Sequence, residues 1–339
     1  MDHEGSSTSR RRALKEISSG LVFAAASSAI AQRGLSQPAP QPPESQPFLP
    51  NFPVEYPRPP FPEQQQPWPG LASKMSPRPD HGETSYRGSG RLFGRKALIT
   101  GGDSGMGRAA AIAFAREGAD VAINYLPQEE PDAVEVIELI RRAGKKGVAL
   151  PGDIREESFC ADLVGKAASQ LGGLDIVVSN AARQVAQKSI LDISTEQFDT
   201  TFKTNVYAMF WILKAAIPHM KPGSTIICTA SINAYDPSVD ILDYAATKGA
   251  IAIFVKGLAK QLASKGIRVN AVAPGPVWTP LQVTGGQKPD KLPAFGAKTP
   301  MGRPGQPAEL APLYVMLADN SASYTTGQIV GATGGESGP

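Results

Sequence analysis

The feature that most constrains the fold is a strand, a glycine-rich turn and a helix in direct succession. Lys96–Thr100 is a short, mostly apolar run typical of a buried strand, and the alanine-rich residues 108–117 predict a helix. Between them stands Gly101-Gly102-Asp103-Ser104-Gly105-Met106-Gly107. Glycines accept positive φ and let the backbone approach a pyrophosphate, which then lies at the N-terminus of the helix. Because the strand precedes it and the helix follows it, the turn predicts a dinucleotide-binding site.

Strand and helix patterns alternate through the rest of the chain. Further strands are expected at residues 120–125, 147–150, 174–178, 224–228, 268–272 and 328–330, and helices at 133–143, 158–170, 195–219 and 244–264. Apolar strands separated by helices indicate a parallel sheet covered on both faces. The expected fold class is therefore α/β, a doubly wound, Rossmann-like parallel sheet that forms a single domain over residues 92–339.

Residues 32–91 predict an extended, proline-rich arm. The segment from Pro38 to Pro79 holds 15 of the 31 prolines, which excludes regular helix and central strands. Aromatic side chains punctuate it, namely Phe48, Phe52, Tyr56, Phe61 and Trp68. That density favours an arm lying on a folded surface over the alternative, a disordered linker.

Residues 1–31 predict a signal peptide. The run Ser9-Arg10-Arg11-Arg12-Ala13-Leu14-Lys15 resembles a twin-arginine export signal, and a short apolar stretch ends in Ala29-Ile30-Ala31. We therefore expect export to the periplasm in folded form, with no stable membrane insertion after processing. The alternative is a disordered basic tail on a cytoplasmic protein.

Composition argues against several classes of function. The net charge of +3 gives no broad electrostatic footprint for nucleic acid. The cysteines, Cys160 and Cys228, and the histidines, His3, His81 and His219, are scattered along the chain. Neither a metal site nor a Ser-His-Asp triad is therefore expected.

Three residues in the second half of the chain predict acid–base chemistry. Tyr244 and Lys248 share one face of a predicted helix, where a lysine lowers the pKa of a phenol. Ser231 follows a predicted strand, and its hydroxyl can donate to a developing alkoxide oxygen. Tyr-x-x-x-Lys alone is a weak signal, but here it occurs in order with the glycine turn and Ser231.

From about residue 92 onward the chain resembles the short-chain dehydrogenase/reductases, in particular the bacterial stress-protein and YghA-like oxidoreductases with their proline-rich arm. The resemblance is carried by Thr100-Gly101-x-x-x-Gly105-x-Gly107, Lys203-Thr204-Asn205-Val206 and Pro274-Gly275-Pro276-Val277-Trp278-Thr279. It implies the catalytic residues Asn205, Ser231, Tyr244 and Lys248. It also implies cofactor contacts from Gly101, Asp103, Ser104, Gly105, Met106, Gly107, Tyr125, Asp153, Ile154, Asn180, Ala181, Ala182, Tyr244, Lys248, Pro274, Gly275, Val277 and Thr279.

The implied reaction is hydride transfer between a nicotinamide cofactor and a small alcohol, aldehyde or ketone, with Tyr244 carrying the proton. Residues 281–302 are the expected lid over that substrate. The alternative is a catalytically idle nucleotide-binding sensor or interaction module, although such proteins generally lose the tyrosine or lysine. Ala182 departs from the family pattern, since it adds a methyl where the family has glycine.

Two further expectations concern the cofactor and the assembly. The second strand ends at Tyr125, so the acid that NAD enzymes usually carry there is missing. No arginine or lysine stands there or in the glycine turn to bind an NADP 2′-phosphate, which Asp103 would repel. Arg108 is the basic residue expected nearby, so the sequence favours NAD, with NADP left open. Two helices carry apolar residues on more than one face, which predicts a homotetramer, and the resemblance implies that these helices build a four-helix contact between two subunits. The apolar residues concerned are Tyr207, Phe210, Trp211 and Leu213 on one helix, and Ile251, Ile253, Phe254 and Val255 on the other.

Overall fold

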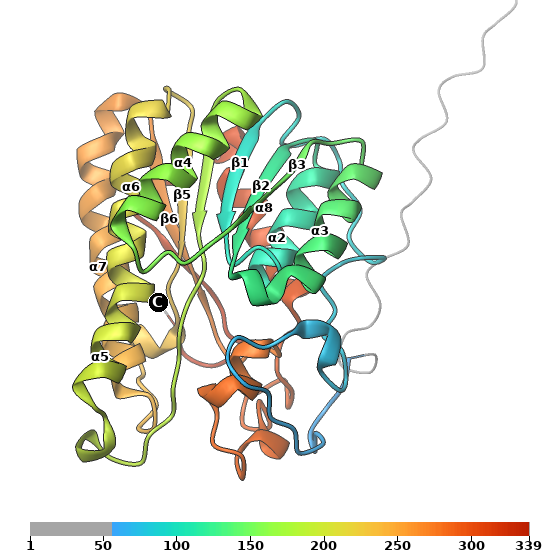
Figure 1. Cartoon of the computed structure of the whole chain (residues 1–339), viewed down its shortest axis with the longest axis vertical. Coiled ribbons are helices and arrows are strands. Elements are labelled where there is room, and N and C mark those ends of the chain that lie inside the picture. Colours follow the sequence, from blue (N-terminus) through green and yellow to red (C-terminus); the bar gives the residue numbers. More distant parts are fainter. Residues whose placement is uncertain (1–55, 339) are drawn as a thin grey trace, which may run out of the picture. The chain divides into compact units, whose positions relative to one another are not determined.

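The computed structural model of the chain describes residues 56–338, which form a seven-stranded parallel sheet with helices on both faces (Figure 1). The strand order is β3-β2-β1-β4-β5-β6-β7. The strands are β1 (Lys96–Thr100), β2 (Asp120–Tyr125), β3 (Gly147–Pro151), β4 (Ile176–Ser179), β5 (Thr225–Thr229), β6 (Arg268–Pro274) and β7 (Ile329–Ala332). The order reverses between β1 and β4, which is where a doubly wound sheet binds its ligand. The expected fold class is confirmed.

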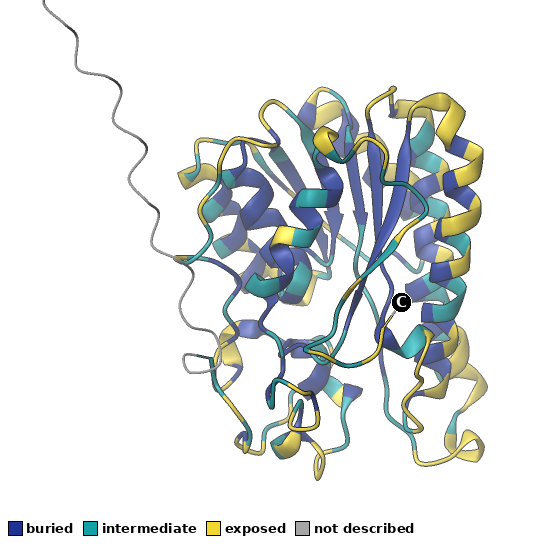
Figure 2. Ribbon diagram, turned by 180° about the vertical axis from the view of Figure 1, so that it is seen from behind, coloured by how far each residue is buried: buried dark blue, intermediate teal, exposed yellow. Residues whose placement is uncertain are grey.

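Alternate residues along the strands pack into two separate hydrophobic cores, one on each face of the sheet. In β1, Leu98 packs on one face, while Ala97 and Ile99 pack on the other. Figure 2 shows that the strands are buried and that the helices turn their exposed residues outward. The first face is covered by α4 (Glu157–Leu171), α6 (Ala208–Ala216) and α7 (Leu242–Leu262), and the second by α2 (Gly105–Arg116), α3 (Glu130–Arg142) and α8 (Pro307–Ala318).

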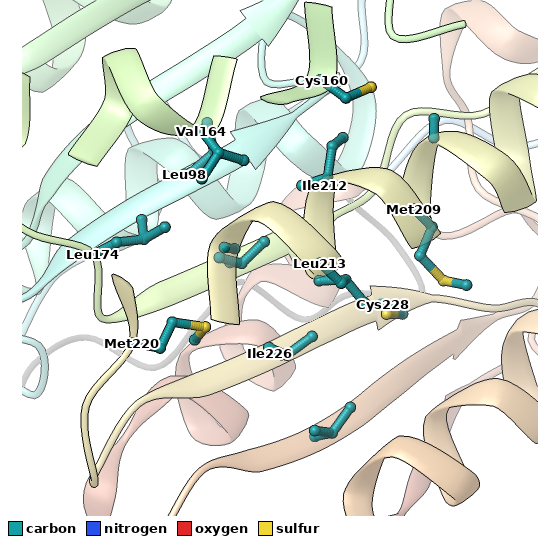
Figure 3. Packing of buried hydrophobic residues seen from close by; sticks show 14 of the residues in the cluster. Leu98, Cys160, Val164, Leu174, Met209, Ile212, Leu213, Met220, Ile226 and Cys228 are labelled. Carbon is teal, nitrogen blue, oxygen red and sulfur yellow. The ribbon is translucent and has the colours of Figure 1, made fainter. Parts of the chain in front are cut away.

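Both cysteines lie in the first of these cores (Figure 3). Cys228 on β5 and Cys160 on α4 are fully buried and unpaired, near Leu98, Val164 and Ile212. Burial raises the pKa of each thiol to about 12. Each therefore acts as a small apolar side chain, as the sequence indicated for Cys228.

Two helical regions differ from the sequence-based expectation. The helix expected over residues 195–219 is interrupted: α5 (Thr195–Phe202) passes through a π-helical turn, Lys203–Tyr207, into α6. The helix α8 was not predicted, because Pro307 and Pro312 obscure its pattern. Pro307 occupies the first turn, where no amide donor is needed, and the ring of Pro312 points to solvent.

Residues 56–91 of the predicted arm lie against the folded unit beside the loop that follows β6 (Figure 1). Phe61 stacks on Trp278 with ring centroids 4.2 Å apart, and the Trp278 indole donates to the carbonyl of Pro77 at 2.8 Å. The amides of Phe61 and Gln66 donate to the carbonyls of Pro293 and Val283, both at 2.9 Å. The arm and this loop therefore share a small apolar core.

A second set of polar contacts ties the arm to α2. Glu83 pairs with the buried guanidinium of Arg108 at 3.0 Å, and Arg116 donates to the carbonyl of Gly82 at 2.7 Å. Tyr86 donates to the carboxylate of Glu117 at 2.6 Å. Arg108 therefore faces the arm, where its charge is compensated, and it is not the cofactor contact considered from the sequence.

The prediction of a signal peptide with twin-arginine export and a periplasmic location is wrong. Residues 1–31 lie outside the described residues, and nothing within residues 56–338 supports export. The pattern itself is weak, since residues 20–31 are mostly alanine and serine, whose transfer from water releases little free energy. Within the part of the chain that the structure describes, no helix is long and apolar enough to cross a membrane.

Candidate functional site

A cleft of about 980 Å³, part of it open to solvent, lies at the carboxyl ends of the central strands. It is the place that the topology of the sheet assigns to a ligand. Fourteen of the predicted site residues line it, namely Gly101, Asp103, Ser104, Gly105, Met106, Tyr125, Asp153, Ile154, Asn180, Ala181, Ala182, Tyr244, Lys248 and Thr279. Residues from 101 to 279 are thus brought together by the parallel strands.

The glycine-rich turn fits a dinucleotide. Gly105 opens α2 with φ +52°, a conformation that side chains rarely adopt. A Cβ on Gly107 would lie 2.0 Å from the carbonyl oxygen of Gly101, so Gly107 lets the helix pack on the turn and does not itself line the cleft. Asp103 Oδ2 is buried without a hydrogen-bond partner among the described residues. The unused acceptor suits a ligand hydroxyl, and the N-terminus of α2 suits a phosphate group.

Gly107→Ala is expected to weaken nucleotide binding at least about tenfold and to lower the stability by about 1–3 kcal/mol, because the turn must shift away from the new methyl. Isothermal titration calorimetry and thermal unfolding measure the two effects. Gly165→Ala is the matched control, since Gly165 lies on α4 with nothing within 4 Å of its added Cβ. That change should leave affinity unaltered and stabilise the helix by about 0.5–1 kcal/mol. Equal affinities in the two variants would contradict the role of Gly107.

Asn180 joins the ends of β1, β4 and β5. Its backbone amide donates to Thr100 Oγ1 at 3.0 Å, and its side-chain amide donates to the carbonyl of Gly101 at 3.3 Å. Thr229 Oγ1 donates to Asn180 Oδ1 at 3.1 Å. Asn180 thereby holds the glycine turn against the strand that leads to the predicted catalytic residues.

Tyr244 and Lys248 lie one turn apart on α7, both buried and both lining the cleft. The ammonium of Lys248 is 5.2 Å from the centroid of the Tyr244 ring and donates to the carbonyl of Thr229 at 2.7 Å. Burial raises the pKa of Tyr244 to about 12, and a hydrogen bond from Ser231 opposes that rise. Burial lowers the pKa of Lys248 to about 7. Without a bound ligand, Ser231 is therefore the group that favours the phenolate of Tyr244. The lowering of the Tyr244 pKa that the sequence predicted for Lys248 is not present.

Asn205 lies in the π-helical turn, beside the cleft rather than on its wall. Its Oδ1 accepts from the amide of Arg183 at 2.7 Å. Its Nδ2 donates to the carbonyl of Arg183 and to Thr247 Oγ1, both at 3.0 Å. The side chain thus connects the loop after β4 to α7, one residue before Lys248, and holds the π-helical turn in register.

Four predicted cofactor residues, Gly107 among them, do not line the cleft. Pro274 ends β6, and the amide of Gly275 pairs with the carbonyl of Ala332 at 2.9 Å. Val277 is buried and forms a bridge to Gly305. The backbone of this loop therefore belongs to the sheet edge, and from the loop motif only Thr279 reaches the cleft. The predicted catalytic residue Ser231 likewise does not line the cleft.

Several cleft residues were not predicted. The arm contributes Trp68, Pro69 and Gly70. Glu129 lines the cleft because the 3-10 turn Pro127–Glu129 folds its carboxylate back to the amide of Leu126 at 2.8 Å. A carboxylate therefore lies on the cleft wall four residues after the end of β2. Arg155 also lines the cleft, and it pairs with Asp153 at 2.9 Å. The only sequence signal for any of these residues was the density of aromatic side chains in the arm, which indicated contact between the arm and the folded unit.

Comparisons with known proteins agree with this geometry. A family model described as enoyl-(acyl carrier protein) reductase, of the short-chain alcohol dehydrogenase type, matches residues 101–337. The uncharacterized oxidoreductases YhxD of Bacillus subtilis and YghA of Escherichia coli are each 59% identical, over 81% of this chain and 93% and 94% of their own lengths.

Solved structures give the same result. A short-chain dehydrogenase from Burkholderia cenocepacia in complex with NADP superposes with a TM-score of 0.68 at 31% identity, covering 72% of this chain and 98% of its own. A 3-ketoacyl-(acyl-carrier-protein) reductase from Brucella melitensis complexed with NADH has a TM-score of 0.65 at 33% identity, with the same coverage. The parallel sheet, the glycine turn and the Tyr244–Lys248 pair therefore stand in a known framework: this chain belongs to the short-chain dehydrogenase/reductase family of oxidoreductases.

Proposed function

We propose that the protein transfers a hydride between a nicotinamide cofactor and a small alcohol or carbonyl compound, with Tyr244 as the proton carrier. The observation that carries this proposal is the burial of Tyr244 and Lys248 side by side on the wall of the nucleotide cleft. A bound nicotinamide supplies the hydride-accepting or hydride-donating carbon and, when oxidised, a positive charge. The glycine turn, Asn180 and Thr279 are the residues that would hold it.

The chain's own groups divide the remaining work. Tyr244 gives its phenolic proton to the carbonyl oxygen during reduction and takes it back during oxidation. Ser231, already hydrogen-bonded to Tyr244, donates to the same substrate oxygen. Asn205 is a positioning residue, because its amide is fully used in holding Arg183 and Thr247.

Turnover tests the proposal. The protein is mixed with NAD or NADP and a panel of alcohols, and with NADH or NADPH and a panel of aldehydes and ketones, while nicotinamide absorbance is followed. Turnover of any member supports it. Tight binding of the nucleotide with no turnover of any compound would favour the idle sensor instead.

We further propose that the cofactor is NAD. Asp103 and Glu129 both line the cleft, and burial raises the pKa of each carboxyl. Their negative neighbours, Asp132 for Asp103 and Asp103 itself for Glu129, raise the pKa further. Such an acidic pair accepts hydrogen bonds from a ribose diol and repels a 2′-phosphate. The comparisons favour NADP instead, since one solved relative is in complex with NADP, another with NADPH and a third with NADH.

The discrimination between the two cofactors should increase with pH. Both carboxyl pKa values are raised, so raising the pH from 6 to 9 removes protons and adds negative charge next to the ribose. The ratio of Kd for NADP to Kd for NAD is expected to rise about tenfold, or ~1.4 kcal/mol. Glu129→Gln, which cannot ionise, should flatten that rise. Tighter binding of NADP at every pH would contradict the proposal.

The homotetramer is also a proposal, supported by apolar side chains on α6, α7 and the π-helical turn before α6. Leu213, Ile251 and Val255 pack inward, but Tyr207, Phe210 and Ile253 are 46%, 44% and 69% exposed. Phe210→Glu is expected to reduce the mass in solution, measured by light scattering, because a carboxylate cannot be buried there. Phe93→Glu, at an exposed phenylalanine in the turn before β1, is the control and should leave the mass unchanged. A monomeric wild-type protein would contradict the assembly itself.

A further inference from the structure

We propose that the N-terminal arm completes the nucleotide site, with Trp68 as a cofactor-binding residue that closes the cleft over the bound dinucleotide. This inference rests on the proposed function, since it requires a dinucleotide in the cleft. It adds to the family's binding motif a residue that lies before the first strand. Trp68, Pro69 and Gly70 line the same cleft as the glycine turn and Tyr244.

The arm spans the cleft from side to side. The Trp68 ring centroid lies 5.7 Å from the guanidinium carbon of Arg155, which follows β3, and 4.9 Å from that of Arg183, which follows β4. Two residues later, Gly70 packs so tightly on Thr284 that an added Cβ would lie 2.4 Å from its methyl group. The segment thus connects the ends of β3 and β4 to the loop after β6, across the cleft.

The chemistry around Trp68 suits a flat, anionic ligand. Burial lowers the pKa of Arg183, and the charge of nearby Arg155 lowers it further. Arg183 Nε is buried and has no hydrogen-bond partner among the described residues. Arg155 lines the cleft, so a phosphate bound there would lie near both guanidinium groups and relieve the repulsion between them. Trp68, still 37% exposed, offers its ring to the same ligand.

The segment is held in place on both sides of Trp68. The amide of Gln66 donates to the carbonyl of Val283 at 2.9 Å, and the amide of Ala72 donates to Asp132 Oδ2 at 2.6 Å. Because these anchors place Trp68 before any ligand binds, little ordering entropy is lost on binding. Contact with the indole would stabilise the bound dinucleotide, and affinity differences among variants of one site lie mostly in the dissociation rate, so the arm should act chiefly on that rate.

Stopped-flow displacement of NADH, or of NADPH if it binds more tightly, tests this inference through nucleotide fluorescence. Trp68→Ala is expected to raise the dissociation rate about tenfold, whereas Trp68→Phe, which keeps an aromatic ring, should stay within about threefold. Phe93→Ala is the matched control, because it removes another exposed aromatic–cation contact, with Lys145, outside the cleft. Its dissociation rate should equal that of the wild type.

A second variant guards against a loosened arm. Arg183→Met removes a partner of Trp68 but leaves the anchors at Gln66 and Ala72 in place, and it should also release the nucleotide faster. Hydrogen exchange over residues 56–91 verifies that the arm stays docked in this variant. Wild-type dissociation rates in both Trp68→Ala and Arg183→Met would overturn the inference alone. A wild-type protein that binds neither NADH nor NADPH would overturn the proposed function.

Discussion

Tyr244→Phe is expected to reduce turnover by about 10²–10⁴-fold while leaving nucleotide affinity within a few-fold. The substitution removes one hydroxyl from a side chain that is already buried in the cleft wall, so the packing of α7 should survive. Steady-state kcat and calorimetric Kd measure the two quantities. Because burial raises the pKa of Tyr244 to about 12, the wild type should oxidise alcohols faster as the pH increases, and the variant should lose that dependence.

Tyr314→Phe is the matched control for this experiment. Tyr314 is an equally buried tyrosine that shares a 2.8 Å hydrogen bond with Thr229 and does not line the cleft. Its variant should lose about 1 kcal/mol of stability and retain turnover within a few-fold. Comparable losses of turnover in the two variants would remove Tyr244 from the proton-carrying role.

Lys248→Met is expected to lower kcat/KM by about 10²–10³-fold, because the cleft loses the amine that would contact the cofactor and, when protonated, attract the charge that develops in the reaction. The stability of the folded protein should change in the opposite direction to its activity, because the variant no longer buries an ionisable amine. The folded pKa of Lys248 is about 7, below the ordinary value of 10.5, so the unfolded chain binds more protons between these pH values. Wild-type stability at this site therefore rises with pH from about 7 toward 10.5, and the variant should lack that contribution.

The measurement is thermal or denaturant unfolding of both proteins from pH 6 to 9, together with kinetics at each pH. Lys256→Met, on an exposed turn of the same helix, controls for the loss of a charge. It should alter neither the kinetics nor the pH profile of stability. A variant Lys248→Met that keeps wild-type kcat/KM would refute the assigned role of the ammonium.

The sequence alone determined the parallel sheet, the dinucleotide turn and the pairing of Tyr244 with Lys248. These features depend on short-range patterns: the apolar run before Gly101, the glycine spacing that lets α2 pack on its turn, and the four-residue spacing that shares one helix face. Their residues act through neighbours a few positions away, or through strand order, which follows from connection rules.

Only the tertiary structure decided how the arm and the cleft wall are built. Trp68 reaches Arg183, Glu83 compensates Arg108, and the Trp278 indole bonds the carbonyl of Pro77, 201 residues earlier in the chain. The same holds for Glu129, whose return to the cleft depends on one turn geometry. Periodicity carries no record of contacts between segments so far apart. Whether a charged side chain is buried, or a residue lines the cleft, depends on which distant segment packs against it, and local sequence patterns do not determine that packing.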